Sequence, residues 1–530
     1  MRTCVAALLL AGLTVISPTS AQSIQSIGTS GGNGPKGGIG DCNHPVTTAQ
    51  AFVTDAVNSE FAKGRQLAKD ATPKLLQKHP GGNVWDVVVN AKSGARQEML
   101  GFGHAWTDST VDVFNQLDAD VLDKLMKELY GQDGNNMGLM RHTIGSSDLS
   151  GEQYSYDDNG PSFNEGSPDK DLAHFDIGYY GERQAKMIAK MGSYKSDVTL
   201  FGSPWSAPSW MKYNGLFIAP NRNVPGGGSY MIANNSFNID YFNTYAQYFG
   251  KYVDAFAKYN VTINAITPQN EPLNYQGGYP CMYLEAADEA SLINNGLGEE
   301  MKKRGVGIWA YDHNTDQSAY PQRVITGAPG QVQAAAWHCY ASPANYTVMS
   351  DFHDNNPDIP QFMTECADGS WSSGPHNFVV ASNFMEPVTN WGSGAAMWVM
   401  ATNASYGPHC PYGGCGSCIG SVIVYGPRNY TLTNQYYMIG QFSRYIRRGA
   451  INYEVTKGIS GTALTNEQFY VNAIKNPDGS WAIVMMNNSN KTQNVVVELD
   501  GEQQYWQATV PEFTLNTWLL PAKKSACSNH

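Results

Sequence analysis

Glu271 and Glu365 are the two residues of this 530-residue chain whose surroundings point most directly to catalysis. Each follows an apolar segment with the composition of a buried strand, VTINAIT before the first and QFMT before the second. Two carboxyl groups that face each other can hydrolyse a glycosidic bond, because one protonates the leaving oxygen while the other attacks the anomeric carbon or activates water. We expect partial burial beside the other carboxylate to raise the pKa of the acid.

A single glutamate at a strand end is more often a structural ion-pair partner than a catalyst. Further polar and aromatic side chains, however, stand at the ends of neighbouring apolar segments: Asp108, Arg141, Asp148, Trp205, His338, Tyr340 and Trp398. Asn270 directly precedes Glu271, and Trp371 comes shortly after Glu365. An amide can hydrogen-bond a sugar hydroxyl and an indole can stack on a sugar face, although aromatic residues often only fill a core. The whole set favours an active site.

Regular alternation of apolar and helical segments predicts the frame that positions these residues. Apolar extended runs lie at 99–106, 137–144, 198–205, 261–267, 306–311, 334–340, 360–365 and 395–400. Helical patterns lie between most of them, but the connection between the fifth and sixth runs shows no convincing helix. We predict an α/β fold, a (β/α)₈ TIM barrel over 101–440, with reactive residues at the C-terminal strand ends. A doubly wound sheet is the alternative, but no Gly-rich phosphate loop follows the first run.

The segments on either side of the predicted barrel have a different sequence pattern, with short apolar runs separated by turn sequences. After residue 450, FYVNAIK, WAIVMM and NVVVEL alternate with turn sequences such as NPDG and NNSN, which indicates strand–turn–strand units. The segment 83–100 has the same character. We therefore predict a β-sandwich side domain built from both chain ends, 83–100 and 441–521. Residues 22–82 are assigned to an N-terminal extension, in which 47–79 can form one amphipathic helix.

Residues 1–21 have the features of a signal peptide, with one Arg, an apolar run and a small residue at Ala21. A membrane anchor is less favoured because the run is short for a span. We expect a secreted, extracellular protein. Removal of this segment leaves eight cysteines, and an even number in an oxidising compartment predicts disulfides. The cluster HCPYGGCGSC at 409–418 is either a metal site or a disulfide-pinned loop, and its Gly, Pro and Ser content favours the loop.

The net charge limits the classes of partner, and the sequons mark possible glycosylation sites. The formal net charge of −12 argues against nucleic acid, because phosphate binding needs a basic face. No later segment is long and apolar enough to cross a membrane. We expect a carbohydrate substrate, no cofactor, no metal ion and a monomer. Sequons begin at Asn234, Asn260, Asn345, Asn403, Asn429, Asn487 and Asn490. We expect Asn403 to be empty, because it follows the eighth run near the predicted site.

Seven ordered segments over roughly 83–521 resemble one known family. They are GFGHAWTDSTVDVFNQL, MRHTIGSSDLSGEQYSYDDNG, GSPWSAPSWMK, NAITPQNEP, IWAYDHNTDQSAYPQ, AWHCYAS and FMTECADGSW. The chain resembles glycoside hydrolase family 30, which contains glucocerebrosidase, and within it the fungal β-1,6-glucanase branch. The resemblance implies a retaining glucan endo-1,6-β-glucosidase that cleaves β-1,6-glucan by double displacement. The alternatives are xylan, galactan or glucosylceramide as substrate, or a catalytically inactive carbohydrate-binding protein.

The resemblance also implies roles for individual residues. Glu271 is expected to be the acid/base and Glu365 the nucleophile. Arg141 would orient the carboxylates. The remaining residues would contact the sugar or line the mouth: Asp148, Trp205, Asn270, His338, Tyr340, Trp371 and Trp398. One departure is His104 in GFGHAW, where the family has a small residue, and we expect the larger side chain to narrow or rearrange the mouth.

Overall fold

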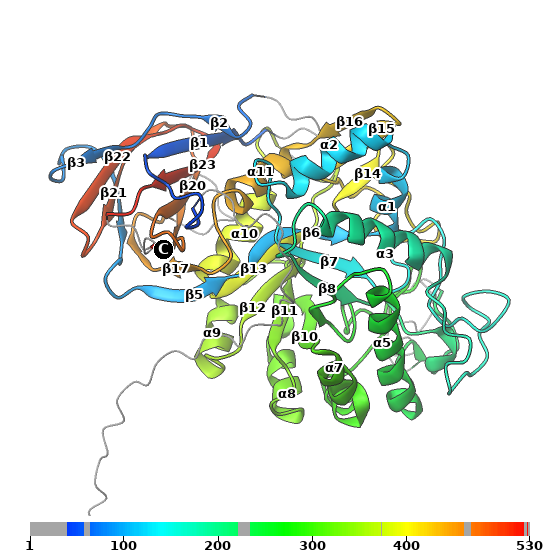
Figure 1. Ribbon diagram of the computed structural model, residues 1–530. Helices are drawn as coiled ribbons and strands as arrows, with labels where there is room; N and C mark the ends of the chain where they lie inside the picture. Colours follow the sequence, from blue (N-terminus) through cyan, green and yellow to red (C-terminus); the bar gives the residue numbers. More distant parts are fainter. Residues whose placement is uncertain are drawn as a thin grey trace, which may run out of the picture.

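Eight parallel strands close into a barrel at the centre of the molecule (Figure 1). In this computed structural model the described residues are 40–57, 64–220, 234–372, 374–460, 468–523 and 527. Each barrel strand pairs with the next one along the chain, and β13 closes the ring on β6. The strands are β6 (Gly101–Trp106), β7 (Leu139–Thr143), β8 (Thr199–Ser203), β9 (Ala265–Ile266), β10 (Gly307–Asn314), β11 (Ala334–His338), β12 (Gln361–Glu365) and β13 (Gly392–Met397). The predicted barrel is confirmed.

Side chains that point into the barrel fill its lower part. Because side chains alternate along a strand, one half of them faces the axis and the other half faces the helices. Leu139, Phe201, Trp309 and Phe362 meet inside, and the rings of Trp309 and Phe362 stack with centroids 4.3 Å apart. This packed floor leaves the C-terminal strand ends as the place where polar groups can gather.

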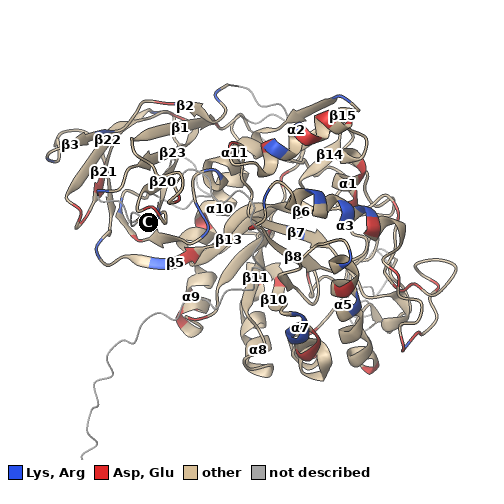
Figure 2. Cartoon of the chain, viewed as in Figure 1, with Lys and Arg blue, Asp and Glu red and all other residues tan. Residues whose placement is uncertain are grey.

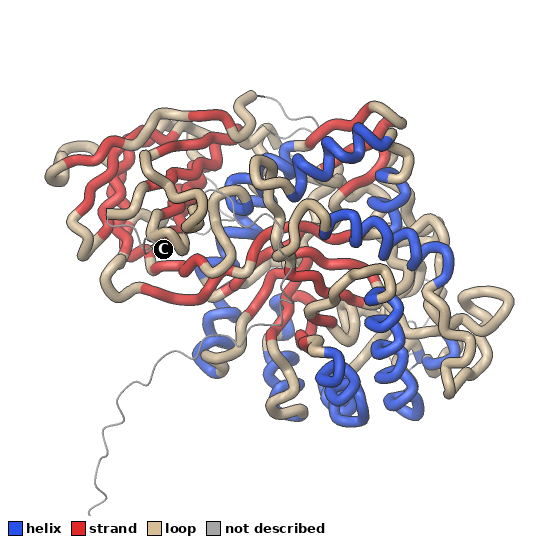
Figure 3. Tube along the Cα trace, in the orientation of Figure 1, coloured by secondary structure: helices blue, strands red, loops and turns tan. Residues whose placement is uncertain are grey.

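Helices surround the barrel on its outer side (Figure 3). They are α1 (Asp108–Phe114), α2 (Ala119–Tyr130), α3 (Gly178–Gly192), α5 (Phe242–Ala257), α6 (Ala286–Leu292), η3 (Ile293–Leu297), α7 (Gly298–Arg304), α8 (Ala319–Gly327), α9 (Thr347–Asn355), α10 (Val379–Thr389) and α11 (Asn434–Ser443), with the short turns η1 (Ser209–Met211), η2 (Ile239–Tyr241) and η4 (Thr315–Gln317). The sequence pattern shows no convincing helix before the sixth strand, but α8 lies there. Its pattern is weak because it has nine residues and buries only Tyr320, Pro321 and Val324.

Strands from both chain ends form a β-sandwich beside the barrel, where blue and red ribbons lie together (Figure 1). One sheet has the order β2 (Ala68–Lys69), β1 (Gln50–Asp55), β23 (Thr514–Leu520), β20 (Trp481–Asn488), β19 (Gln468–Lys475), β17 (Ala450–Tyr453) and β5 (Ala95–Met99). The other has β18 (Val455–Lys457), β4 (Trp85–Val89), β21 (Gln493–Leu499), β22 (Gln504–Val510) and β3 (Lys74–Leu76). Between them pack Val87, Trp481, Val497 and Trp518.

The helix expected within 47–79 is wrong. The segment QAFVTD forms strand β1, which pairs in antiparallel fashion with β23. Ala51, Val53 and Thr54 are buried, while Phe52 is only partly buried, and the whole segment has the backbone pairing of an extended strand. The sandwich therefore includes residues that the sequence analysis assigned to an N-terminal extension.

The cysteine count predicts disulfides, and three are present among the described residues. Cys42 pairs with Cys527, Cys339 with Cys366 and Cys415 with Cys418, while Cys281 and Cys410 are buried free thiols. The third pair lies in the loop expected to be pinned in this way. That loop follows β13 together with a small sheet of β14 (Ala401–Asn403), β15 (Val422–Gly426) and β16 (Asn429–Leu432).

Charged residues of both signs lie next to each other on outer helices such as α2, α3 and α7 (Figure 2). Within the described ranges, every helix is too short or too polar to span a membrane. The predicted signal peptide at 1–21 lies outside the described residues.

Candidate active site

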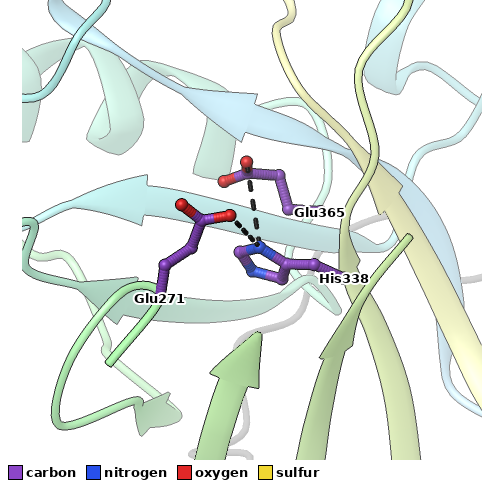
Figure 4. Close-up of side chains that lie close together, drawn as sticks. All are labelled: Glu271, His338 and Glu365. Atoms are coloured by element: carbon purple, nitrogen blue, oxygen red, sulfur yellow. Dashed lines mark hydrogen bonds and ion pairs between the residues drawn. The ribbon is translucent and has the colours of Figure 1, made fainter. Parts of the chain in front are cut away.

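The carboxylates of Glu271 and Glu365 lie close together at the C-terminal mouth of the barrel, and the ring of His338 lies beside them and contacts both (Figure 4). Glu365 is the last residue of β12, and His338 is the last residue of β11. The disulfide between Cys339 and Cys366 joins the residues that follow these two strands. This link ties the nucleophile candidate to the strand that carries His338.

Glu271 lies in the loop after β9, with a left-handed backbone φ of 46°. Its N–H donates to the carbonyl of Asp312 at 3.0 Å, and its carbonyl accepts from the N–H of Asn274 at 2.7 Å. A non-glycine residue in this conformation carries backbone strain, which is often found at functional sites. The strand is shorter than the apolar run, so the glutamate is aimed by these loop hydrogen bonds.

The two carboxylates are close enough for a retaining pair. One oxygen of Glu271, one of Glu365 and one ring nitrogen of His338 all lie within 4.8 Å of one another. Retaining glycosidases hold their carboxyl groups about 5–5.5 Å apart, whereas inverting enzymes leave about 6.5–9.5 Å to admit a water molecule. The observed proximity of these oxygens fits the retaining arrangement, in which one carboxylate attacks directly, better than the wider inverting one.

Arg141 on β7 is fully buried beneath these carboxylates. Its guanidinium donates to Oε2 of Glu365, to Oδ1 of Asn270 at 2.7 Å and to Oδ2 of Asp312 at 2.8 Å. A buried guanidinium holds a planar fork of donors in fixed directions. It therefore orients Glu365, and it also holds the amide that precedes Glu271.

Asp312 at the end of β10 is a site residue that sequence reasoning missed. Its Oδ2 accepts hydrogen bonds from Arg141, Ser203 and Thr267. Its Oδ1 interacts with Nε2 of His338 at 2.9 Å and accepts from Thr364 at 2.6 Å. Burial acts in the opposite direction, but the charges of Arg141 and His338 hold the pKa of Asp312 well below its usual range.

His338 links three carboxylates. Its Nε2 faces Asp312, and its Nδ1 lies 3.4 Å from Oε1 of Glu271 and 3.9 Å from Oε1 of Glu365. Burial disfavours the charged ring, yet the charges of Glu365 and Asp312 raise the pKa of His338 to about 9. At neutral pH this imidazole is therefore protonated and donates to the carboxylates around it.

The expected rise in the pKa of the acid is wrong. Burial raises the pKa of Glu271, but the hydrogen bond from His338 and the charge of His313 lower it to about 2. Asn274 also donates to Oε2 of Glu271 at 2.9 Å. A second carboxylate nearby is thus outweighed by two imidazoles and an amide, which stabilise the ionised form of Glu271.

Two segments of the chain match descriptions of one enzyme family. Residues 99–446 match the glycosyl hydrolase family 30 TIM-barrel domain, and residues 458–518 match the family 30 beta sandwich domain. The chain belongs to glycosyl hydrolase family 30. The predicted family and the predicted combination of barrel and sandwich are confirmed.

Relatives of this family 30 hydrolase include two proteins named endo-1,6-beta-D-glucanase. The one from Aspergillus fumigatus is 39% identical over 92% of this chain and 98% of its own length. The one from Trichoderma harzianum is 39% identical over 91% of this chain and 96% of its own length. The lysosomal acid glucosylceramidase of Mus musculus is 24% identical over 80% of this chain and 81% of its own length.

Solved structures share the fold of this family 30 hydrolase. A structure titled as an endo-beta1,6-glucanase superposes with a TM-score of 0.74 at 24% identity, covering 90% of this chain and 100% of the other. SrfJ from Salmonella typhimurium superposes with a TM-score of 0.76 at 18% identity, with the same coverage.

Other predicted residues also lie at the mouth of this family 30 hydrolase. The hydroxyl of Tyr340 donates to Oε1 of Glu365 at 2.9 Å. The rings of Trp205 and Trp398 lie 4.9 Å apart, and the guanidinium of Arg141 lies 4.7 Å from the first ring and 5.8 Å from the second. Both indoles are buried, so they support the guanidinium from one side as well as closing the site.

Asp148 lies in the loop after β7. Its Oδ2 accepts from the N–H of Cys415 at 3.0 Å, while its buried Oδ1 has no hydrogen-bond partner among the described residues. Burial and the charge of Glu365 raise the pKa of Asp148 to about 7. An unpaired buried oxygen of this kind is ready to hydrogen-bond a polar ligand.

Two residues singled out by the sequence, Asp108 and His104, form no hydrogen bond with Glu271 or Glu365 among the described residues. Asp108 begins α1 and accepts hydrogen bonds from Ser150 and Tyr154. His104 is on β6 but points outward, with Nε2 2.5 Å from Oγ of Ser421. The expectation that His104 narrows the mouth is therefore wrong, because alternation along β6 directs Ala105, its neighbour, toward Trp205 and Trp398.

Glu271, His338 and Glu365 also have the spacing of a possible metal site. Metal ligation needs a neutral imidazole, however, and the raised pKa of His338 keeps a proton on this ring. The donor set fits proton sharing between the ring and the carboxylates better than it fits metal coordination.

Proposed function

We propose that this chain is a secreted, retaining endo-β-1,6-glucanase. The observation that carries the proposal is the Glu271–Glu365 pair, spaced for double displacement in a chain 39% identical to two proteins named endo-1,6-beta-D-glucanase. The substrate would be a neutral β-1,6-linked glucan. Such a substrate needs no electrostatic steering, which agrees with the negative net charge of the chain.

In the first step a carboxylate oxygen of Glu365 attacks the anomeric carbon, and the bond from that carbon to the leaving oxygen breaks. Glu271 gives its proton to the leaving oxygen, so that the departing chain ends in a hydroxyl group. In the second step Glu271 takes a proton from water, the water oxygen attacks the anomeric carbon, and Glu365 is released. Two inversions give net retention.

Neighbouring residues prepare this chemistry. Arg141 and Tyr340 each donate to a different oxygen of Glu365, which fixes the direction of attack. The proton for the leaving group is held by the pair of His338 and Glu271, whose Nδ1 and Oε1 atoms lie 3.4 Å apart. Such a pair titrates as a unit, so the ring and Glu271 share one proton, which moves to Glu271 when a leaving oxygen lies beside that carboxylate.

Binding of the sugar is assigned to residues around the carboxylates. Asp148 would accept hydrogen bonds from sugar hydroxyl groups through its unpaired Oδ1. Asn270, held by Arg141, would contact the hydroxyl next to the anomeric carbon, while Trp205 and Trp398 close the floor. The enzyme would act as a monomer outside the cell, and residues 1–21 would direct its export.

Side-by-side initial rates on linear β-1,6-glucan, β-1,3-glucan, cellulose and xylan test this proposal. We expect release of reducing ends from β-1,6-glucan and little from the other three polymers, with internal cleavage giving mixed oligosaccharides early in the reaction. Glucosylceramide and galactan complete the panel. The variant Glu365→Gln is the control for contaminating activity. Faster cleavage of xylan or β-1,3-glucan than of β-1,6-glucan would overturn the proposed substrate.

A further inference from the structure

A short loop spans the mouth of the barrel from the Asp148 side to the Glu365 side. We call residues 410–418 the rim loop. At its start the N–H of Cys410 donates to the carbonyl of Asp148 at 2.7 Å, and further along the N–H of Cys415 donates to the Asp148 carboxylate at 3.0 Å. The backbone and the side chain of one predicted sugar-binding residue are thus both held by this loop.

The far end of the rim loop joins the loop that follows β12. The N–H of Ser370 donates to the carbonyl of Ser417 at 3.1 Å, and Gly369 forms an antiparallel bridge with Cys418. The disulfide between Cys415 and Cys418 closes this half of the loop. The rim loop is therefore fixed at both ends and stiffened between them.

The middle of the rim loop lies against the loop that carries Glu271. A Cβ atom added to Gly413 would lie 2.6 Å from the carbonyl oxygen of Gly278. Only glycine allows two backbones to approach this closely. On the same stretch Tyr279 accepts a hydrogen bond from Asn274, which also donates to Glu271. The rim loop thus reaches the surroundings of both predicted catalytic residues.

Two large aromatic side chains project from this framework into solvent. Tyr412 is 59% exposed, and Trp371 is 53% exposed. The ring of Tyr412 lies 6.1 Å from that of Phe163, and the indole of Trp371 covers Gly369 so closely that a Cβ there would meet it at 2.1 Å. Exposed rings on rigid supports are typical of binding surfaces, because little conformational entropy is lost when a ligand stacks on them.

The chemistry of the rim loop selects the class of ligand. Residues 410–418 contain no Lys, Arg, Asp or Glu, in a chain of net charge −12. An uncharged surface of glycines, small polar groups and flat rings fits a neutral sugar rather than an anionic ligand. A β-1,6-linked chain has an extra rotatable bond in every unit, so a preorganised surface reduces the entropy lost on ordering it.

We propose that the rim loop and the adjoining Trp371 form a glucan-binding surface, on which Tyr412 and Trp371 stack against glucosyl units beyond the two that flank the scissile bond. Tyr412 is the residue that determines preference for long chains. The proposal rests on the proposed function, because it assumes that the occupant of the mouth is a β-1,6-glucan.

The variant Tyr412→Ala tests the proposal on β-1,6-linked oligosaccharides of increasing length and on the polymer. We expect KM for the polymer to rise about 3- to 10-fold in this variant, with kcat changed less than about 2-fold, because stacking is made equally before and at the transition state. Activity on the shortest cleaved oligosaccharide stays at the wild-type level. Tyr412→Phe keeps the ring and restores KM.

The matched control is Tyr179→Ala, which removes a tyrosine that is 68% exposed on α3. It leaves all kinetic constants unchanged. Binding of the same oligosaccharides to Glu365→Gln, with and without Tyr412→Ala, gives the affinity without turnover. This inference would be overturned if Tyr412→Ala lost the same fraction of its activity on short and long substrates, or lost none. Wild-type activity on β-1,6-glucan would in that case still support the proposed function. Wild-type enzyme inactive on β-1,6-glucan would overturn both.

Discussion

The guanidinium of Arg141 donates to the carboxylate of Asp312 at 2.8 Å, and neither side chain is exposed to solvent. A buried ion pair of this kind is unfavourable unless every charge is compensated. Here the same guanidinium contacts Glu365, and the same aspartate contacts His338. Asp312 therefore positions two groups that themselves touch the predicted nucleophile and acid, without facing the substrate.

Asp312→Asn tests this positioning role with an isosteric change. The buried charge of Arg141 then loses a partner, so we expect the free energy of unfolding to fall by about 3–5 kcal/mol. The pKa of His338 falls as well, which moves the alkaline limb of the kcat/KM profile to lower pH. Urea unfolding and pH–rate profiles measure the two effects.

The exposed pair of Asp254 and Arg304 supplies the control for this substitution. Their nearest charged atoms lie 2.7 Å apart, but the Asp254 side chain is 57% exposed. Asp254→Asn should lower the free energy of unfolding by no more than about 1 kcal/mol and leave the pH profile unchanged. A pH profile of Asp312→Asn that matches wild type would show that the aspartate has a structural role only.

The sequence predicted the barrel and the residues at its mouth because strand periodicity and strand-end position are local properties. Arg141, His338, Tyr340 and Glu365 lie on or directly after strands and gather as expected. Asp312 was missed because the apolar run was ended at residue 311, whereas β10 continues through Asn314. Asp312 is the polar residue directly after that run, and this position at a strand end was the signal that could have identified it.

Other features depended on contacts that a single sequence does not display. The outward direction of His104 follows from the register of β6 against its neighbours. The low pKa of Glu271 depends on His313 and His338, which come from two other strands. β1 is a strand because β23, more than 400 residues later, supplies its hydrogen bonds. For β1, long-range pairing overrides local propensity.

Stability should depend on alkaline pH through His338. Its pKa is raised from 6.5 to about 9 by Glu365 and Asp312, against the effect of burial. The folded state therefore binds this proton more tightly than the unfolded state, so the stabilisation is complete below pH 6.5 and is lost as the pH rises through about 9. We expect the free energy of unfolding to fall by about 3 kcal/mol over that range.

His338→Gln should remove this part of the pH dependence. Urea denaturation at pH 6, 7.5 and 9 for both proteins measures it, and the difference between wild type and variant should shrink toward pH 9. A difference that stays constant over the range would contradict the assigned raised pKa.

Glycan occupancy should differ between two sequons whose local conformations are alike. In each, the Asn Oδ1 accepts from the N–H and hydroxyl of the residue two positions on, Thr347 for Asn345 and Ser489 for Asn487. Asn345 is exposed, whereas Asn487 is fully buried and its Nδ2 donates to three carbonyl oxygens.

We therefore expect a glycan on Asn345 and none on Asn487 in folded protein secreted by a eukaryotic host. Peptide mapping after enzymatic deglycosylation in heavy-oxygen water measures both sites in one sample. Asn403 is half-buried and its Oδ1 accepts two backbone N–H groups, and it stays predicted to be empty. A fully occupied Asn487 in active enzyme would contradict the burial argument, because a glycan there would have to displace three hydrogen bonds.

The roles of Glu271 and Glu365 can be separated by their response to an added nucleophile. Glu365→Gly should abolish turnover of every substrate, because no covalent intermediate can form without the carboxylate. Glu271→Ala should lower the rate on glucan by about 10²–10⁴-fold, because the natural leaving oxygen then departs unprotonated. An activated aryl leaving group needs little protonation, so its departure is spared in Glu271→Ala. With Glu365→Gly, azide should attack from the face that Glu365 vacates and give an α-glycosyl azide by one inversion. With Glu271→Ala, azide should attack the covalent intermediate and give a β-glycosyl azide. The opposite stereochemistry would mean that the carboxylate held by Arg141 and Tyr340 is the acid/base and that the one beside His338 and Asn274 is the nucleophile.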